Sequence, residues 1–286
     1  MKKNKNTDGF PHTHPDLCDE LPLWSSPFGL KLLEAINYRC GITALDIGFG
    51  SGFPLIELAM RLGDSCNVYG IDPWKNIIAQ VKRKIECFGI STISLITGFA
   101  ESIPLPDCSI DCITSNNGIN NVQDIEQVFS ECSRVLKPGG QFVWTMNTEQ
   151  TMFEFYTHLE QVLAEMKLDH CIDAMYRHID EKRPPVTRLL AILRQKGFTI
   201  RSLEPEQFTY RFADGTAMLN HYFINIAFIE SWKSFLPPDE EEEVFLRVET
   251  RLNEYARICG GMKLSIPFVL VDAVKTEEQG ETDGLS

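Results

Sequence analysis

Long apolar runs and positive charge are both scarce in this sequence. No stretch approaches the roughly 18 consecutive apolar residues that a membrane-spanning helix needs, so we expect no membrane span. The 27 Lys and Arg residues are outnumbered by 40 Asp and Glu residues, which gives a formal net charge of −13. Because phosphate contacts need a basic face, this balance argues against a nucleic-acid partner.

Patterns typical of metal sites, disulfides and secretion are also missing. The nine cysteines are dispersed, with no CxxC pair and no Cys/His cluster at zinc-ligand spacing. The basic start "MKKNKNTDGF" leads into no apolar segment of the kind that a signal peptide requires. We therefore expect a cytoplasmic protein with reduced thiols and no bound metal.

The 286 residues, 43% of them hydrophobic, suffice for one large domain with additions. Polar composition without periodicity predicts disorder for residues 1–15 and 276–286. We expect residues 16–275 to form the folded domain, and the sequence leaves its oligomeric state open.

Strands and amphipathic helices are predicted to alternate from about residue 43 onward. The predicted strands cover residues 43–47, 68–71, 93–97, 110–115, 141–145, 198–203 and 265–274. The predicted helices between them cover residues 54–62, 75–88, 125–136 and 186–196. Asp124 and Gln127 resemble a capping box at the start of the third helix. Such alternation predicts an α/β, Rossmann-like fold, with a seven-stranded, mostly parallel sheet and helices on both faces.

Three glycines, Gly48, Gly50 and Gly52, occupy alternate positions in "ALDIGFGSGFPLIELAMRLG", between the first predicted strand and its helix. Glycine lets the backbone turn tightly and lets a ligand approach without meeting a Cβ atom. The helix that follows offers free N–H groups and the positive end of its dipole. Dinucleotides and S-adenosylmethionine are the two ligand classes that use such a turn.

The spacing of the glycines separates these two classes. A dinucleotide fingerprint reads G-x-G-x-x-G, and counted from Gly48 its third glycine would fall at Phe53. The pattern present is D-x-G-x-G-x-G, beginning at Asp46. Asp72 ends the second strand about twenty residues past the last glycine, where an acidic side chain can accept hydrogen bonds from ribose hydroxyls. Asp72 precedes Pro73 and also suits the cap of the next helix.

Three blocks together make the chain resemble the class I S-adenosylmethionine-dependent methyltransferases. "LDIGFGSG" matches the glycine loop of that family, "GFAESIPLPDCSIDCITS" resembles its G-D-A-x-x-L-P-F-x-D-x-x-F-D block, and "VFSECSRVLKPGGQFV" its R-V-L-K-P-G-G block. The blocks span roughly residues 40–148 at matching order and spacing. The resemblance is to the branch that contains the ubiquinone/menaquinone C-methyltransferases and the arsenite methyltransferases. It implies the class I methyltransferase fold, methyl transfer to a small-molecule substrate, and S-adenosylmethionine as methyl donor.

The resemblance also implies roles for residues at matching positions. Asp46 and the three glycines would surround the methionine part of the cofactor, and Asp72 would hold the ribose. Ala100, through its backbone, and Glu101 would lie beside the adenine. Phe99 stands where the family usually has an acidic residue, so we expect it to pack against the adenine in place of a carboxylate contact.

Asn116 and Asn117 would face the sulfonium side of the cofactor by the same resemblance. Methyl transfer from a sulfonium mainly needs positioning of donor and acceptor, and a general base only where the acceptor loses a proton. No catalytic triad is therefore expected. The candidates for a catalytic role are Asn117, Asn120 and His221, although a buried histidine packed between helices is the plainer interpretation of His221.

Acceptor recognition is expected outside the shared core. The predicted substrate cap consists of two inserts of helical character, residues 151–185 and 206–262. Near the N-terminus, Trp24 and Phe28 precede a predicted helix and are expected to be core or lid residues.

Arsenite methylation can be weighed from the sequence. Enzymes of that type resemble one another in a block like S-N-C-V-I-N after the fourth strand, and here the matching stretch is "SNNGIN", with Asn117 in place of the reactive cysteine. Cys108 and Cys112 are nearby, but Cys112 falls in a predicted buried strand. This argues against arsenic as the acceptor.

Two other function classes stay open. One is a nicotinamide-dependent oxidoreductase, which Phe53 at the third-glycine position disfavours. The other is a non-catalytic protein that binds S-adenosylmethionine, because a fold does not secure a reaction.

Overall fold

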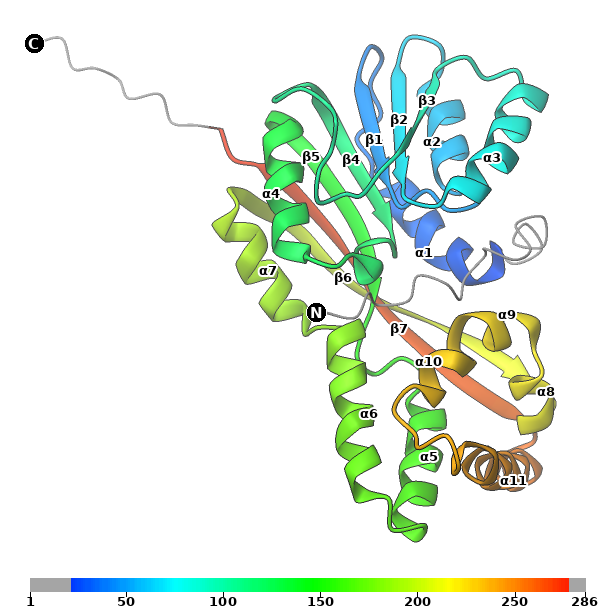
Figure 1. Cartoon of the computed structure of the whole chain (residues 1–286). Helices are drawn as coiled ribbons and strands as arrows, with labels where there is room; N and C mark the ends of the chain where they lie inside the picture. The colour runs from blue at the N-terminus through cyan, green and yellow to red at the C-terminus, as the bar shows by residue number, and fades with distance from the viewer. Residues whose placement is uncertain (1–21, 278–286) are drawn as a thin grey trace, which may run out of the picture. The chain divides into compact units, whose positions relative to one another are not determined.

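The computed structural model describes residues 22–277 and contains a seven-stranded sheet in the order β3-β2-β1-β4-β5-β7-β6 (Figure 1). The strands are β1 (Thr43–Ile47), β2 (Asn67–Asp72), β3 (Ile93–Thr97), β4 (Ile110–Asn116), β5 (Leu136–Asn147), β6 (Phe198–Phe212) and β7 (Met262–Lys275). The longer helices are α1 (Pro22–Glu34), α2 (Leu55–Leu62), α3 (Lys75–Cys87), α4 (Ile125–Val135), α5 (Phe153–Glu165), α6 (Asp169–Lys182), α7 (Val186–Gln195) and α11 (Glu241–Cys259). The predicted α/β, Rossmann-like fold is confirmed.

The order of the strands reverses between β1 and β4. From β1 the chain moves outward through β2 and β3, then returns to β4 on the other side of β1. All four pairings among β1 to β5 are parallel, and Asp46 of β1 lies directly beside Thr114 of β4. Ligands of open α/β sheets bind at the carboxyl ends of the strands at such a reversal.

The central strands β1, β4 and β5 bury residues on both faces, as expected within a parallel sheet. In β1, Leu45 and Ile47 point into a core completed by α4 and α7, whereas Ala44 points into a second core formed with α1, α2 and α3. The same alternation holds in β5, where Phe142 and Trp144 belong to the first core. Asp46 therefore points to the face that α1, α2 and α3 cover.

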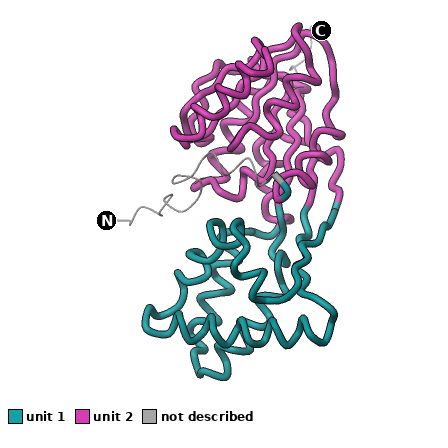
Figure 2. Tube along the Cα trace, turned by 90° about the vertical axis from the view of Figure 1, so that its right-hand side faces the viewer, with its two compact units in different colours: residues 1–23, 147–185, 205–268 teal, residues 24–146, 186–204, 269–286 magenta. Residues whose placement is uncertain are grey.

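The chain divides into two compact units, which Figure 2 colours separately. The sheet unit comprises residues 24–146, 186–204 and 269 onward, and the helical unit comprises residues 147–185, 205–268 and the two described residues before Trp24. The divisions fall inside β6 and β7, so both strands contribute residues to both units. The predicted inserts, 151–185 and 206–262, fall in the helical unit.

The helical unit has a core of its own. In it the Trp232 ring stacks on Phe155 with centroids 3.8 Å apart, and its Nε1–H donates to the Tyr156 hydroxyl over 3.0 Å. The buried Glu154 carboxylate accepts hydrogen bonds from the backbone N–H and the hydroxyl of Ser265. Besides α5, α6 and α11, this unit contains α8 (Gly215–Leu219), α9 (Tyr222–Ile224), a π-helical turn (Asn225–Ile229) and α10 (Glu230–Lys233).

Several predicted boundaries are corrected by the structure. α4 ends at Val135, within one residue of the prediction, but β5 starts at Leu136 rather than at residue 141, so "KPGG" lies within the strand. β6 continues to Phe212, although helical character was expected from residue 206, because Phe208, Tyr210 and Phe212 alternate along one face and their rings contact one another. Trp24 lies inside α1 and does not precede the helix.

The predicted disordered ends lie almost wholly outside the described residues. Of residues 276–286 only the first two are described, and Thr276 donates its backbone N–H to the Gly197 carbonyl over 2.8 Å. No helix between residues 22 and 277 is both long and apolar enough to cross a membrane. In the same range, no group of three or more His, Cys, Asp or Glu side chains is arranged to hold a metal ion.

Phe129 of α4 tests the first core. It is fully buried, and its ring centroid lies 6.0 Å from those of Phe142 and Trp144. We expect Phe129→Ala to lower the free energy of unfolding by about 3–5 kcal/mol, because it removes a large buried side chain and leaves a cavity. Denaturant unfolding measures this. Phe88→Ala, at a site 58% exposed, is the control and should cost far less; equal losses would contradict the described core.

Candidate functional site

The glycine loop lies at the carboxyl end of β1, where the strand order reverses. Gly48, Gly50 and Gly52 have φ values of 77°, 49° and 106°, which side-chain-bearing residues rarely adopt. A Cβ atom on Gly48 would lie 3.2 Å from the Cα atom of Gly118, so bare backbone at both positions lets the two loops meet. A Cβ atom on Gly50 would meet nothing within 4 Å. The loop thus leaves open space above Gly50.

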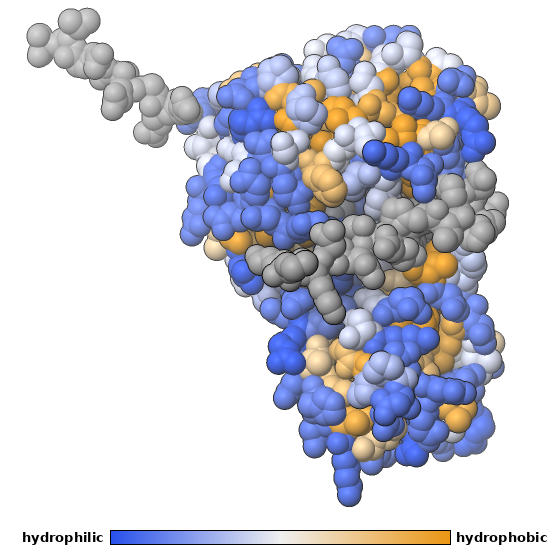
Figure 3. All heavy atoms as spheres, viewed as in Figure 1, coloured by the Kyte–Doolittle hydropathy of each residue, from blue (hydrophilic) through white to orange (hydrophobic). Residues whose placement is uncertain are grey.

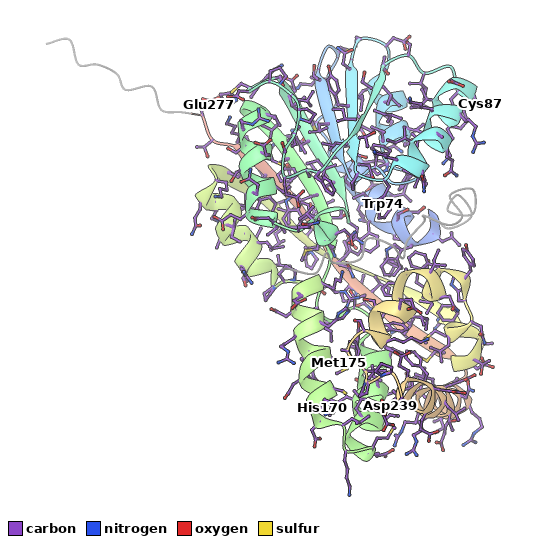
Figure 4. All side chains as sticks on the ribbon, in the orientation of Figure 1. Trp74, Cys87, His170, Met175, Asp239 and Glu277 are labelled. Atoms are coloured by element: carbon purple, nitrogen blue, oxygen red, sulfur yellow. The ribbon has the colours of Figure 1, made fainter. Side chains whose placement is uncertain are left out.

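Asp72 fixes this loop. One carboxylate oxygen accepts the Gly50 N–H over 3.0 Å, and the other accepts the Trp74 N–H over 2.9 Å at the start of α3, where Figure 4 marks Trp74. Burial raises the pKa of Asp72, and the two backbone N–H donors oppose that rise. Since each carboxylate oxygen has more than one acceptor position, Asp72 keeps capacity for a further donor. The predicted cap and the predicted ribose contact are therefore compatible.

Asp46 is fully buried under the loop. Its Oδ1 atom accepts a hydrogen bond from the Thr114 hydroxyl over 2.6 Å, and among the described residues its Oδ2 atom has no hydrogen-bond partner. Burial raises its pKa from 3.8 to about 7, the negative charge of Asp72 adds to the rise, and the Thr114 hydrogen bond opposes it. A buried carboxylate oxygen without a donor has an unmet need for a positive or hydrogen-bonding group.

Polar side chains continue across the ends of β4 and β5. The Asn116 side chain accepts a hydrogen bond from the Thr145 hydroxyl over 3.1 Å and donates one to the Ser25 carbonyl of α1 over 3.1 Å. Asn117 has a φ of 57°, and its N–H donates to the Thr145 carbonyl. Helix α1 is thereby held against the site, a contact that the sequence did not predict.

The loop after β3 contains the three residues expected beside the adenine. Phe99 is 54% exposed and Ala100 is buried. The Glu101 carboxylate accepts the backbone N–H groups of Gln123 (2.8 Å) and Asp124 (3.3 Å), just before α4. Glu101 thus ties the loop after β3 to the segment after β4, a structural role that the resemblance did not imply.

The predicted capping box forms only in part. The Gln127 N–H donates to the Asp124 side chain over 3.0 Å, as expected. The Gln127 side chain donates instead to the backbone carbonyl of Glu101. The Asp124 N–H, which the Gln127 side chain would accept in a capping box, donates to the Glu101 carboxylate.

The three catalytic candidates fall in different parts of the molecule. Asn117 and Asn120 lie in the sheet unit, Asn120 in a short 3₁₀ turn after β4. His221 lies in the helical unit, where its ring packs 5.3 Å from Phe212 and 6.2 Å from Tyr210. Its ring partners are on strand β6, not on a second helix.

Cys112 is buried in β4, as predicted, and burial raises its pKa to about 12. A thiol held in its neutral form is a poor nucleophile and metal ligand.

The arrangement at the sheet edge fits an aminoacyl sulfonium nucleoside. Gly50 leaves an open space, Asp72 is a fixed acceptor, and Asp46 is an acidic group without a complete set of donors. All three belong to the sheet unit.

Comparison with known proteins agrees with this geometry. Residues 45–144 match the family model described as "Methyltransferase domain". This part of the chain is therefore similar in sequence to methyltransferase domains. The demethylmenaquinone methyltransferase of Bacillus licheniformis is 38% identical over 125 residues, which are 44% of this chain and 53% of that protein. That of Anoxybacillus flavithermus is 29% identical over 184 residues, 62% of this chain and 78% of that protein.

The chain spans about half the length of most of the curated relatives it matches. Among solved structures, YcgJ of Bacillus subtilis has a TM-score of 0.57 at 17% identity, covering 88% of this chain and 100% of that chain. A SAM-dependent methyltransferase of Aquifex aeolicus has a TM-score of 0.53 at 19% identity, covering 68% and 92%. At such identities the likeness concerns the fold, and the [4+2]-cyclase SpnF, with a TM-score of 0.53, shares it too.

Asp72→Asn tests the ribose contact of the methyltransferase domain. The amide keeps an oxygen for the Trp74 N–H but loses the second carboxylate oxygen as an acceptor. We therefore expect the binding free energy of S-adenosylhomocysteine to become less favourable by about 1–3 kcal/mol. Calorimetry measures it. Glu86→Gln on the exposed side of α3 is the control. An unchanged constant in Asp72→Asn would remove this residue from the site.

Asp46→Asn tests the buried carboxyl. With a pKa raised from 3.8 to about 7, the folded chain keeps a proton that the unfolded chain has released, so stability falls as pH rises through that window. We expect the variant to show a weaker fall in the free energy of unfolding across the window than the unmodified chain. Asp64→Asn, at an exposed position, should retain the original dependence. Parallel curves for Asp46→Asn and the unmodified chain would contradict the assignment.

Proposed function

We propose that this chain transfers a methyl group from S-adenosylmethionine to a small-molecule acceptor. The observation that carries the proposal is the glycine loop tied to Asp72 above the incompletely paired Asp46, within a methyltransferase domain. The cofactor supplies an activated methyl group on a positively charged sulfur. The chain's own residues then need to bind, orient and exclude water.

In this proposal Asp72 accepts hydrogen bonds from the ribose, and the open space at Gly50 admits the methionine part next to bare backbone. Phe99 and Ala100 flank the adenine, whereas Glu101 acts through the segment after β4. Asn116 and Asn117 face the acceptor side, where Thr145 and Ser25 orient Asn116. None of these groups is a strong base, so an acceptor that must lose a proton would have to be acidic itself.

We further propose that the methyl acceptor is a quinone-type molecule. It is supported by the name of the relatives, demethylmenaquinone methyltransferase, whose matches cover 125 residues in two of the examples. The arsenite alternative is disfavoured by Asn117 at the cysteine position and by the buried Cys112 thiol.

Gly50→Ala tests the cofactor cradle against a matched control. Gly50 and Gly41 both have positive φ, and a Cβ atom on either would meet nothing within 4 Å, so both alanine variants carry similar backbone strain. Only Gly50 borders the proposed cofactor. We expect Gly50→Ala to weaken S-adenosylhomocysteine binding by about tenfold or more and Gly41→Ala to leave it unchanged. Equal affinities would contradict the placement of the cofactor.

Turnover is tested by incubating the protein with methyl-labelled S-adenosylmethionine and either a demethylated quinone or a cell extract. Label transferred to the quinone supports the finer proposal, and label on another metabolite keeps the methyltransferase while replacing the acceptor. Tight S-adenosylhomocysteine binding without any labelled product would identify a non-catalytic binder. Thermal stabilisation by NAD but not by S-adenosylhomocysteine would favour the oxidoreductase.

A further inference from the structure

The helical unit contains an open groove of about 380 Å³ along α5 and α6, distinct in its residues from the methyltransferase site. Its lining comes from the start of α5 and the segment before it, from the second half of α6, and from Pro185. Figure 4 labels His170 and Met175 on α6, and Figure 3 shows, from the same side of the molecule, apolar surface interspersed with hydrophilic surface. All the lining residues lie within residues 149–185, so the groove belongs to one unit.

Aromatic rings form much of its surface. Phe153 and Tyr176 each expose 52% of their surface, whereas Tyr156, which also lines the groove, is buried. Large aromatic side chains that line a concave surface and remain exposed are typical of a binding site rather than of a core.

The charged groups of the lining are all acidic. Glu149, Glu160 and Asp180 contribute carboxylates, and no Lys or Arg is among the described residues that line the groove. The Tyr176 hydroxyl donates to the Glu160 carboxylate over 3.0 Å, which orients that carboxylate. Among the described residues, neither the Glu149 nor the Asp180 carboxylate has a hydrogen-bond or ion-pair partner.

Some other acidic side chains of the same unit are paired with basic residues. Glu165 accepts a hydrogen bond from Arg251, and Glu243 is bonded to Arg247 over 2.6 Å.

One aromatic ring of the groove, that of Tyr156, already lies near a cationic side chain of this chain. The buried Arg183 has its guanidinium carbon 5.9 Å from the centroid of Tyr156. It does not line the groove, so the exposed faces of Phe153 and Tyr176 are the ones open to a ligand.

We propose that this groove binds a small organic cation with an apolar body, such as a substituted ammonium compound. Aromatic faces attract such cations through their quadrupoles, and the carboxylates at the rim add charge complementarity. An anion would be repelled by the three carboxylates. A neutral apolar molecule would use the rings but leave those charges without a partner.

Calorimetry or NMR titration of the full chain with benzyltrimethylammonium tests the proposal, with benzyl alcohol as the neutral comparison. We expect the cation to bind about tenfold more tightly than the alcohol, and added salt to weaken its binding. Equal affinities, or no binding of the cation up to about 10 mM, would overturn the proposal.

A double variant, Glu160→Gln with Asp180→Asn, should lower the affinity for the cation about fivefold or more and leave that for benzyl alcohol unchanged. Asp173→Asn is the matched control, since Asp173 is exposed on α6 but does not line the groove. Cation affinity that is insensitive to the double variant would also overturn the site. S-adenosylhomocysteine binding should be the same in all three proteins, so failure here is distinguishable from failure of the proposed methyl transfer.

Discussion

The hydrogen bond between the Gly50 N–H and the Asp72 carboxylate is the constraint on which the site depends. It joins the loop after β1 to the end of β2, and through the Trp74 N–H the same carboxylate also sets the start of α3. A glycine loop alone would be free to adopt many conformations, at a cost in entropy whenever a ligand selected one. Here one buried acidic group removes that freedom before any ligand arrives, and the open space at Gly50 is held ready.

Asp46, buried under the same loop, is energetically unfavourable for folding when its carboxyl is charged. Its carboxyl is buried near the acidic Asp72, and within residues 22–277 its side chain accepts one hydrogen bond, from the Thr114 hydroxyl. Such a group opposes folding in its charged form and would be relieved by a positive charge nearby. Sites that bind charged ligands commonly carry instability of this kind, which the rest of the fold offsets. In this chain the offset comes from two apolar cores on opposite faces of one sheet.

Much of the fold could be predicted because local signals coincide with the global arrangement. Short apolar runs bounded by glycine or by caps gave β1 to β4 within one or two residues, and the D-x-G-x-G-x-G pattern located the loop. The pairing of Asp46 with Thr114 was not predicted, because the register of β1 against β4 brings together residues 68 positions apart in the sequence. The features that the sequence did not predict depend on contacts between residues far apart in the chain. Helix α1 meets Asn116 across 91 residues of sequence, and the division inside β6 leaves no local mark.

Glu101 links the chain segment that follows β3 to the segment that follows β4. Its carboxylate and its carbonyl both bond to residues at the start of α4, so the chain leaving β3 and the chain leaving β4 share one set of hydrogen bonds. Neither segment can loosen without releasing donors of the other. The loop after β3 and the segment after β4 are therefore coupled through Glu101, and a change in one is expected to disturb the other.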